Sequence, residues 1–186
     1  MTADELRIRL AAIAAEPNHT LIAYGEEMLD ELPRPPIPAA VLVPVVLGPR
    51  PSILLTKRTA HLKKHAGQVS FPGGRIDPED AHPEAAALRE AEEEIALNPT
   101  DVQVLGRMAD YVTGTGYRIT PVLGLLPPGL SYRPSPDEVE AVFELPIHVL
   151  LDPNAPRRGP HPEFFIWGAT AAILKHLAEK LTEGRG

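Results

Sequence analysis

The sequence predicts an α/β fold (α+β in the stricter usage), in which helices pack against a β-sheet. Two observations lead to this prediction. Apolar runs of strand length recur between residues 40 and 145, whereas helical patterns are confined to the start, the middle and the end of the chain. The 186 residues are 44% hydrophobic, which is enough for one domain with its own core. We therefore expect a single domain over residues 1–186, with residues 1–35 as a helical and extended lead-in and residues 36–186 as the core.

The lead-in begins with an expected helix over residues 3–15, where leucine, isoleucine and alanine recur before Pro17 ends the pattern. Residues 32–38 contain four prolines and are typical of stiff, extended chain. This segment is too short to separate two domains.

The first expected strands are residues 40–47 and 52–58, joined as a hairpin. Because proline has no N–H to donate to a neighbouring strand, Pro44 predicts an edge position or a bulge for the first of them. A shorter strand at residues 68–71 leads into the turn Pro72-Gly73-Gly74, whose glycines allow backbone angles that other residues resist.

The strongest helical pattern of the chain is residues 83–97, which are rich in alanine and glutamate. Asp80 is its expected N-terminal cap, and Asn98-Pro99 ends it. The remaining expected elements are strands at residues 102–112, 117–126 and 139–145 and an amphipathic helix at residues 167–181.

Composition excludes several kinds of function. The formal charge of -7 disfavours nucleic acid and acidic membranes as partners, except where basic residues cluster, as they do between Lys57 and Lys64. The absence of cysteine excludes disulfides and thiolate chemistry, so a metal site would need oxygen or histidine ligands. No stretch is typical of a signal peptide or a membrane span, and we expect a cytoplasmic protein.

Three acids of the middle helix form the candidate metal site. Glu90, Glu93 and Glu94 are three and four residues apart, so they project from one helix face, where their like charges destabilise an isolated helix. Hard divalent ions such as Mg²⁺ prefer carboxylate and water oxygens. The alternative is an ordinary solvated helix face. The preceding glycine turn and acidic loop favour the metal site, because they would let backbone amides approach a phosphate.

Gly74, Arg89-Glu90, Glu93-Glu94 and Leu97 resemble the signature of the Nudix hydrolases. The resemblance implies a mixed β-sheet sandwiched between helices and a pyrophosphohydrolase, that is, a hydrolase of phosphorus-containing anhydrides. This sequence departs from the signature in having Asp80 in place of its first glutamate, one extra residue before Arg89, and Ala96 in place of a glycine. The first two departures put Asp80 in doubt as a metal ligand, and a left-handed Ala96 would cost about 1 kcal/mol.

The same resemblance implies roles for these residues. Glu90 and Glu94 would be the main ligands of Mg²⁺ (or Mn²⁺), Glu93 a further ligand or the general base, and Arg89 the residue that orients these carboxylates. The catalytic residues would be Glu93, Glu94 and Arg89. One more acid often comes from a distant strand or loop in this family, and Glu140 is the candidate, in competition with Glu138 and Glu144.

The segment before the glycine turn, from Leu54 to Gly74, contains Leu-Leu-Thr-x-Arg, a basic stretch, His-x-Gly and Phe-Pro-Gly-Gly. It resembles the additional motif of the coenzyme A pyrophosphatase branch of the family. The basic residues could receive the 3′-phosphate of coenzyme A or could simply balance the acidic helix, while Trp167 could stack on adenine or belong to the core. The implied substrate-binding residues are Arg58, Lys63, Lys64, His65, Gly73 and Gly74.

The expected reaction is therefore metal-dependent hydrolysis of the diphosphate bond of coenzyme A or acyl-coenzyme A, giving 3′,5′-ADP and 4′-phosphopantetheine or its acylated form. The alternatives are another nucleoside diphosphate derivative such as ADP-ribose, a Nudix domain that binds a nucleotide without hydrolysing it, and a structural domain with an acidic helix. Family members often pair, so a homodimer is expected.

Overall fold

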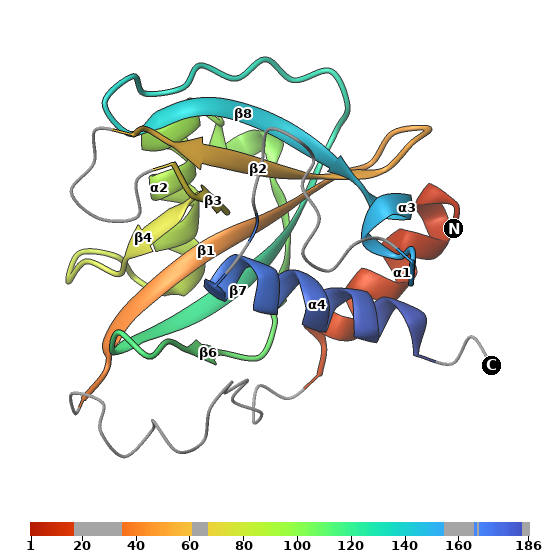
Figure 1. Ribbon diagram of the computed structural model, residues 1–186, viewed down its shortest axis with the longest axis horizontal. Helices are drawn as coiled ribbons and strands as arrows, with labels where there is room; N and C mark the ends of the chain where they lie inside the picture. The colour runs from red at the N-terminus through yellow and green to blue at the C-terminus, as the bar shows by residue number, and fades with distance from the viewer. Residues whose placement is uncertain (17–34, 61–66, 155–165, 167, 184–186) are drawn as a thin grey trace.

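A computed structural model describes residues 1–16, 35–60, 67–154, 166 and 168–183 of the chain. It confirms the α/β prediction, because a mixed β-sheet lies between helices on its two faces (Figure 1). The helical elements are α1 (Ala3–Ala14), α2 (Pro83–Ile95), the 3₁₀-helix η2 (Pro99–Asp101), α3 (Ile147–Leu150) and α4 (Gly168–Thr182). The strands are β1 (Ile37–Val46), β2 (Ser52–Arg58), β3 (Val69–Ser70), β4 (Gly73–Arg75), β5 (Gln103–Arg107), β6 (Tyr111–Val112), β7 (Tyr117–Leu126) and β8 (Val139–Pro146).

The sheet is built around β1 and β7, which run parallel over ten residue pairs from Ile37 and Tyr117 to Val46 and Leu126. Strands β3, β2, β1, β7 and β5 lie side by side in that order. The three remaining strands attach antiparallel: β4 to β1, β6 to β7 and β8 to β2. The sequence patterns thus located most strands but contained no information on their order.

The prediction that Pro44 marks an edge or a bulge is wrong, because β1 lies in the interior of the sheet. Two different strands share one side of β1: β4 pairs with residues 39–41 and β2 with Val45 and Val46. Pro44 falls between these two pairings, so its missing N–H leaves no ladder hydrogen bond unmade on that side. A proline is therefore tolerated in a central strand.

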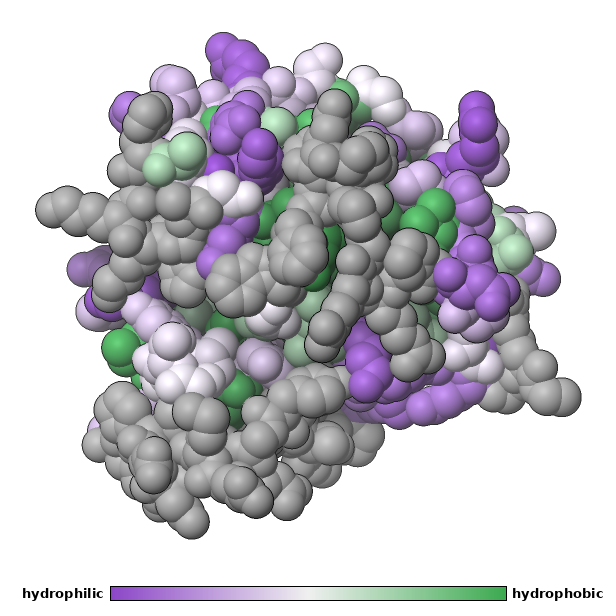
Figure 2. Space-filling model, in the orientation of Figure 1, coloured by the Kyte–Doolittle hydropathy of each residue, from purple (hydrophilic) through white to green (hydrophobic). Residues whose placement is uncertain are grey.

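Alternating side chains of the strands point to opposite faces of the sheet and belong to two separate hydrophobic cores. In β1, Val43 and Val45 belong to a cluster that includes Leu6 of α1 and Leu177 of α4, so the N-terminal helix is part of the core. Leu42 faces the other way, into a cluster built on the alanines of α2. Figure 2 shows the same side of the molecule as Figure 1, and hydrophilic side chains of the described residues lie along much of its outer edge. Among the described residues, no helix combines the length and apolar character needed to cross a membrane.

Three elements differ from the sequence-based expectation. Residues 102–112 form two strands, β5 and β6, because the pairing with β7 is interrupted between Arg107 and Tyr111. The glycine turn contains a short strand, β4, which the local sequence does not favour and the pairing with β1 produces. The third difference is α3, a four-residue helix directly after β8 that is too short to show a periodic pattern.

The caps of α2 also differ from expectation. His82, not Asp80, is the N-cap, and its ring nitrogen Nδ1 accepts the Ala85 N–H at 3.2 Å. At the other end Ala96 adopts a left-handed conformation with φ of 55°, the only positive φ of a non-glycine residue in the described part of the chain. The side chain makes this conformation unfavourable, by about 1–2 kcal/mol.

We therefore expect Ala96→Gly to stabilise the protein by about 0.5–1 kcal/mol, after allowance for the greater freedom of glycine in the unfolded chain. Thermal unfolding followed by circular dichroism measures this change. The matched control is Ala11→Gly, at an exposed interior position of α1, which should destabilise by a similar amount. Destabilisation by both substitutions would show that the left-handed cap costs the fold nothing.

Candidate active site

The three acids of α2 are buried to very different degrees. The exposed fraction of the side chain is 4% for Glu94, 17% for Glu90 and 59% for Glu93. The helix packs against β4 and β1, and Glu94 faces this packing while Glu93 faces solvent. The three acids predicted to share one helix face therefore differ in burial, from the buried Glu94 to the exposed Glu93.

The two glycines of β4 allow this close packing. A Cβ at Gly74 would lie 2.5 Å from Glu90 Oε1, and one at Gly73 would lie 2.6 Å from the Cα of Val41 in β1. The backbone N–H of Gly73 donates to Glu94 Oε2 at 3.3 Å. Glycine is required here because a side chain would occupy the space taken by the carboxylates and by β1.

Arg89 connects the acids of the helix to the acidic loop before it. Its Nε and Nη2 donate to the two oxygens of Asp80 at 3.0 and 2.9 Å, and its Nη1 donates to Glu90 Oε1 at 3.1 Å and reaches Glu93 at 3.4 Å. The hydrogen bond from Arg89 holds the pKa of Asp80 below its ordinary value. Asp80 is thus a partner of Arg89.

The negative charges of Glu90 and Glu94 are only partly balanced by nearby positive charge. Burial raises the pKa of Glu94 to about 8, although Arg58 Nη1, 3.8 Å from Glu94 Oε1, lowers it in part. Burial also raises the pKa of Glu90 against the opposing effect of Arg89. The negative charge of Glu138 adds to both shifts. A cation placed between Glu90 and Glu94 would remove this cost.

The donor set fits a magnesium ion better than a soft metal. Within the described ranges, no three acidic, histidine or cysteine side chains are arranged to enclose a metal. Mg²⁺ is commonly held by one or two carboxylates, with water and phosphate oxygens completing its shell. Glu90, which is half-buried, and Glu94, which is buried one turn later, meet that requirement.

The segment from Arg133 to Ser135, before β8, is hydrogen bonded to the C-terminal end of α2. The N–H of Ser135 donates to Glu94 O at 2.8 Å, and that of Arg133 to Ile95 O at 2.9 Å. The buried Thr59 then holds the next turn, because its N–H donates to Glu138 O at 3.0 Å and its hydroxyl to Asp137 O at 3.2 Å. These bonds fix the backbone of Glu138 beside the site, a contact between distant segments that no local pattern indicates.

The other two candidate acids have different partners. Glu140 lies where the pairing of β2 with β8 shifts register, and it forms an ion pair with Lys57 at 3.0 Å. Glu144 accepts a hydrogen bond from Ser52, farther along the same strand pair. Of the three acids, Glu138 is therefore the one whose charge acts on both Glu90 and Glu94.

The basic motif is described only in part. Arg58 lies against Glu94, and its Nε is buried with no hydrogen-bond acceptor among the described residues. The other predicted substrate-binding residues of the motif, Lys63, Lys64 and His65, lie outside the described residues, and so does Trp167.

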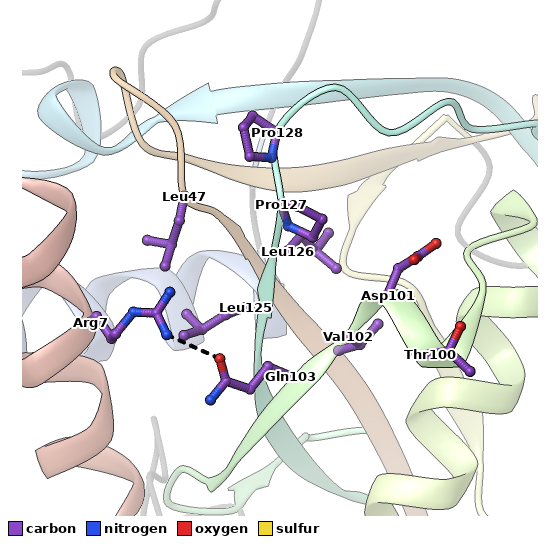
Figure 3. A pocket seen from close by; sticks show the side chains of 10 residues that line it. All are labelled: Arg7, Leu47, Thr100, Asp101, Val102, Gln103, Leu125, Leu126, Pro127 and Pro128. Atoms are coloured by element: carbon purple, nitrogen blue, oxygen red, sulfur yellow. Dashed lines mark hydrogen bonds between the residues drawn. The ribbon is translucent and has the colours of Figure 1, made fainter.

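A separate hollow of about 470 Å³ lies at the far ends of β5 and β7, beside α1 (Figure 3). Its lining includes Arg7 and Gln103, which are hydrogen bonded at 3.2 Å, and the prolines 127 and 128. None of the acids of α2 lines it, so it is not the candidate active site.

Comparison with known proteins identifies the family and the fold. Residues 36–167 match the NUDIX domain family. The chain is 49% identical over 154 residues to "Uncharacterized Nudix hydrolase NudL" of Escherichia coli K12, with 75% of this chain and 80% of the relative covered. It resembles the solved structure of the Nudix hydrolase RenU from M. smegmatis, with a TM-score of 0.57, 21% identity and coverage of 77% of this chain and 84% of that one. A second similar structure is the NUDIX domain of Shewanella oneidensis NrtR complexed with ADP ribose, with a TM-score of 0.55, 17% identity and coverage of 86% and 100%.

The raised pKa of Glu94 predicts that metal-free protein loses stability as the pH rises. The folded state keeps this proton up to about pH 8, whereas the unfolded chain releases it near 4.5, so unfolding becomes easier between these two values. We expect the melting temperature to fall by several degrees from pH 5 to pH 8 in chelator, and Mg²⁺ at pH 8 to restore it. Differential scanning fluorimetry across this range provides the measurement.

The matched variants are Glu94→Gln, which cannot ionise, and Glu93→Gln, which removes the same charge from an exposed position. Only Glu94→Gln should flatten the dependence of the melting temperature on pH. An equally steep fall in both variants would assign the effect to other groups.

Proposed function

The chain belongs to the Nudix hydrolase family, and from that premise we propose that it hydrolyses the diphosphate bond of coenzyme A or an acyl-coenzyme A. Family membership makes it a pyrophosphohydrolase. The proposed products are 3′,5′-ADP and 4′-phosphopantetheine or its acylated form.

One observation carries this proposal. The segment that resembles the coenzyme A motif is in direct contact with the acids of α2, because Arg58 at the end of β2 lies 3.8 Å from the Glu94 carboxylate. The pairing of Thr56 with Ser70 brings both described ends of this segment to the same place. The position of Arg58 beside Glu94 supports a role for this motif in binding an anionic substrate.

The proposed roles of the residues follow from their burial and partners. Glu90 and Glu94 would hold a divalent cation, Mg²⁺ or Mn²⁺, which supplies charge neutralisation of the diphosphate and a lower pKa for bound water. Arg89, held by Asp80, keeps Glu90 in place. Glu93 is exposed, so its carboxylate is accessible to a water molecule and can accept a proton or complete the ligand set. Gly74 leaves the space that the Glu90 carboxylate needs, and Gly73 lets β4 lie close to β1.

The first experiment compares substrates. With Mg²⁺ or Mn²⁺, we expect kcat/KM for coenzyme A and acetyl-coenzyme A to exceed the values for ADP-ribose and NADH by at least tenfold, because only the first two carry a 3′-phosphate that gives the protein an additional group to recognise. Chelator should abolish turnover of every substrate. Phosphate release coupled to a phosphatase and product separation by chromatography give the rates.

Two results would contradict the proposal. Equal or faster turnover of ADP-ribose would assign another nucleoside diphosphate derivative as the substrate, and no turnover of any compound would favour a domain that binds nucleotides without hydrolysing them.

The second experiment tests the ligand set. Glu94→Gln should lower kcat by at least a hundredfold while the protein stays folded, because a neutral amide binds Mg²⁺ poorly. Its matched control is Glu92→Gln, an exposed position on the same helix that does not share the site's face, and it should leave kcat unchanged.

The additional acid is tested by the same assay. We propose that Glu138 assists the cation, whereas Glu140 remains a sequence-based prediction with Lys57 as its partner. Glu138→Gln should raise the Mg²⁺ concentration needed for half-maximal activity more than Glu140→Gln does. The reverse order would return that role to Glu140.

A further inference from the structure

Arg75 and Tyr117 form a pair across the start of β1. In the sheet, Arg75 of β4 lies opposite Ala39, and Tyr117 of β7 lies opposite Ile37, so β1 runs between them. The Arg75 Nη2 donates to Tyr117 Oη at 2.8 Å, and the guanidinium carbon is 5.6 Å from the centre of the tyrosine ring. Both contacts restrict the guanidinium to one position beside the ring.

This pair lies on the opposite face of the sheet from the acids of α2. The Cβ direction of Gly74 points at Glu90, and successive residues of a strand point to opposite faces, so the side chain of Arg75 points away from α2. The backbone of Arg75 is nevertheless part of the site, because its carbonyl accepts a hydrogen bond from Arg89 at 3.2 Å. Arg75 is thus next to the site in sequence but separate from the place proposed for the diphosphate.

The charge of Arg75 is not neutralised by the described residues. The exposed Arg75 side chain forms no ion pair with a carboxylate of the described residues and donates to the neutral phenol of Tyr117, whereas the neighbouring Arg118 is paired with Asp110. In a chain with a net charge of -7, an oriented arginine of this kind is available to an anionic ligand.

We propose that Arg75, oriented by Tyr117, binds a phosphomonoester of the substrate that is separate from the diphosphate being cleaved. The inference rests on the proposed function, under which this group is the 3′-phosphate of the adenosine part. The planar guanidinium can donate two parallel hydrogen bonds to phosphate oxygens, and holding it in advance against Tyr117 lowers the entropy lost on binding. Arg75 is a specificity-determining residue in this arrangement, and Tyr117 is a positioning residue.

The kinetic test compares coenzyme A with 3′-dephospho-coenzyme A. Arg75→Gln should raise KM for coenzyme A roughly tenfold and leave KM for the dephospho compound unchanged, because only coenzyme A loses a charge-assisted contact. Tyr117→Phe keeps the ring but removes the hydroxyl, so it should raise KM for coenzyme A about two- to fivefold. The kcat values should change little in either variant.

The matched control is Arg118→Gln, which removes the same charge from the residue after Tyr117. Arg118 is paired with Asp110, so this variant should leave both KM values as they are in the wild type. A rise in KM for coenzyme A of the same size in Arg118→Gln would show a general effect of charge and overturn the proposal.

Binding of the adenosine fragment separates this inference from the proposed function. Calorimetry with 3′,5′-ADP and with 5′-AMP should show tighter binding of 3′,5′-ADP to the wild type, and Arg75→Gln should lose that preference. If coenzyme A is not cleaved but this preference exists and is lost in the variant, the proposed function fails and the phosphate site stands.

The proposed function can also hold while the phosphate site fails. If coenzyme A is cleaved but Arg75→Gln changes KM equally for both substrates, or for neither, the pair has only a structural role and the phosphate site is wrong. Equal affinity of the wild type for 3′,5′-ADP and 5′-AMP would overturn it as well.

Discussion

The burial of the Glu94 carboxylate is the constraint on which the rest of this site depends. An ionised carboxylate removed from water needs compensating charge or several donors, yet Glu94 receives one N–H from Gly73 at 3.3 Å and has an arginine at 3.8 Å. Glu90, four residues earlier, adds a like charge. The glycines of β4 let this strand lie close to both β1 and the Glu90 carboxylate. The charge of Arg89 is shared between the acids of α2 and Asp80, to which it donates a hydrogen bond. The negative charge that remains between Glu90 and Glu94 is consistent with the cation proposed for this site.

The two faces of the sheet carry the two groups of residues for which roles are proposed. One face carries α2, where the acids, the glycine approach and Arg58 meet, and the opposite face carries the Arg75–Tyr117 pair at the start of β1. The strand β4 joins them, because Gly74 packs on Glu90 while Arg75 points to the other side. A substrate with a diphosphate and a second phosphate could therefore be held at two places that a single short strand fixes relative to each other.

The sequence predicted those parts of the structure that depend on local pattern. The helix over residues 83–95 and its acids follow from composition and spacing, and the expected end at residue 97 is only two residues late. The N-cap was wrong because Asp80 is held by Arg89, nine residues away, which left the cap to His82. The position of Pro44 was wrong because the rule assumes one continuous neighbour on each side, whereas two strands share one side of β1. From the sequence, Glu138 was one of two acids competing with Glu140 for this role, and no local pattern could choose among them, since the hydrogen bonds of Thr59 and of the end of α2 bring its turn to the site.

The helix proposed to carry the chemistry, α2, is itself unfavourable. Its like charges, its buried carboxylate and the left-handed Ala96 each lower its stability, so tertiary contacts must hold it at both ends. At the start of the helix, Arg107 of β5 donates two hydrogen bonds, of 2.6 and 2.7 Å, to the Glu84 carboxylate. At the end, the N–H groups of the segment that leads to Glu138 satisfy the carbonyls that a helix terminus leaves open. The same contacts therefore hold the helix in place and bring the additional acid to it, which gives a physical reason why a site that costs stability can persist in a stable fold.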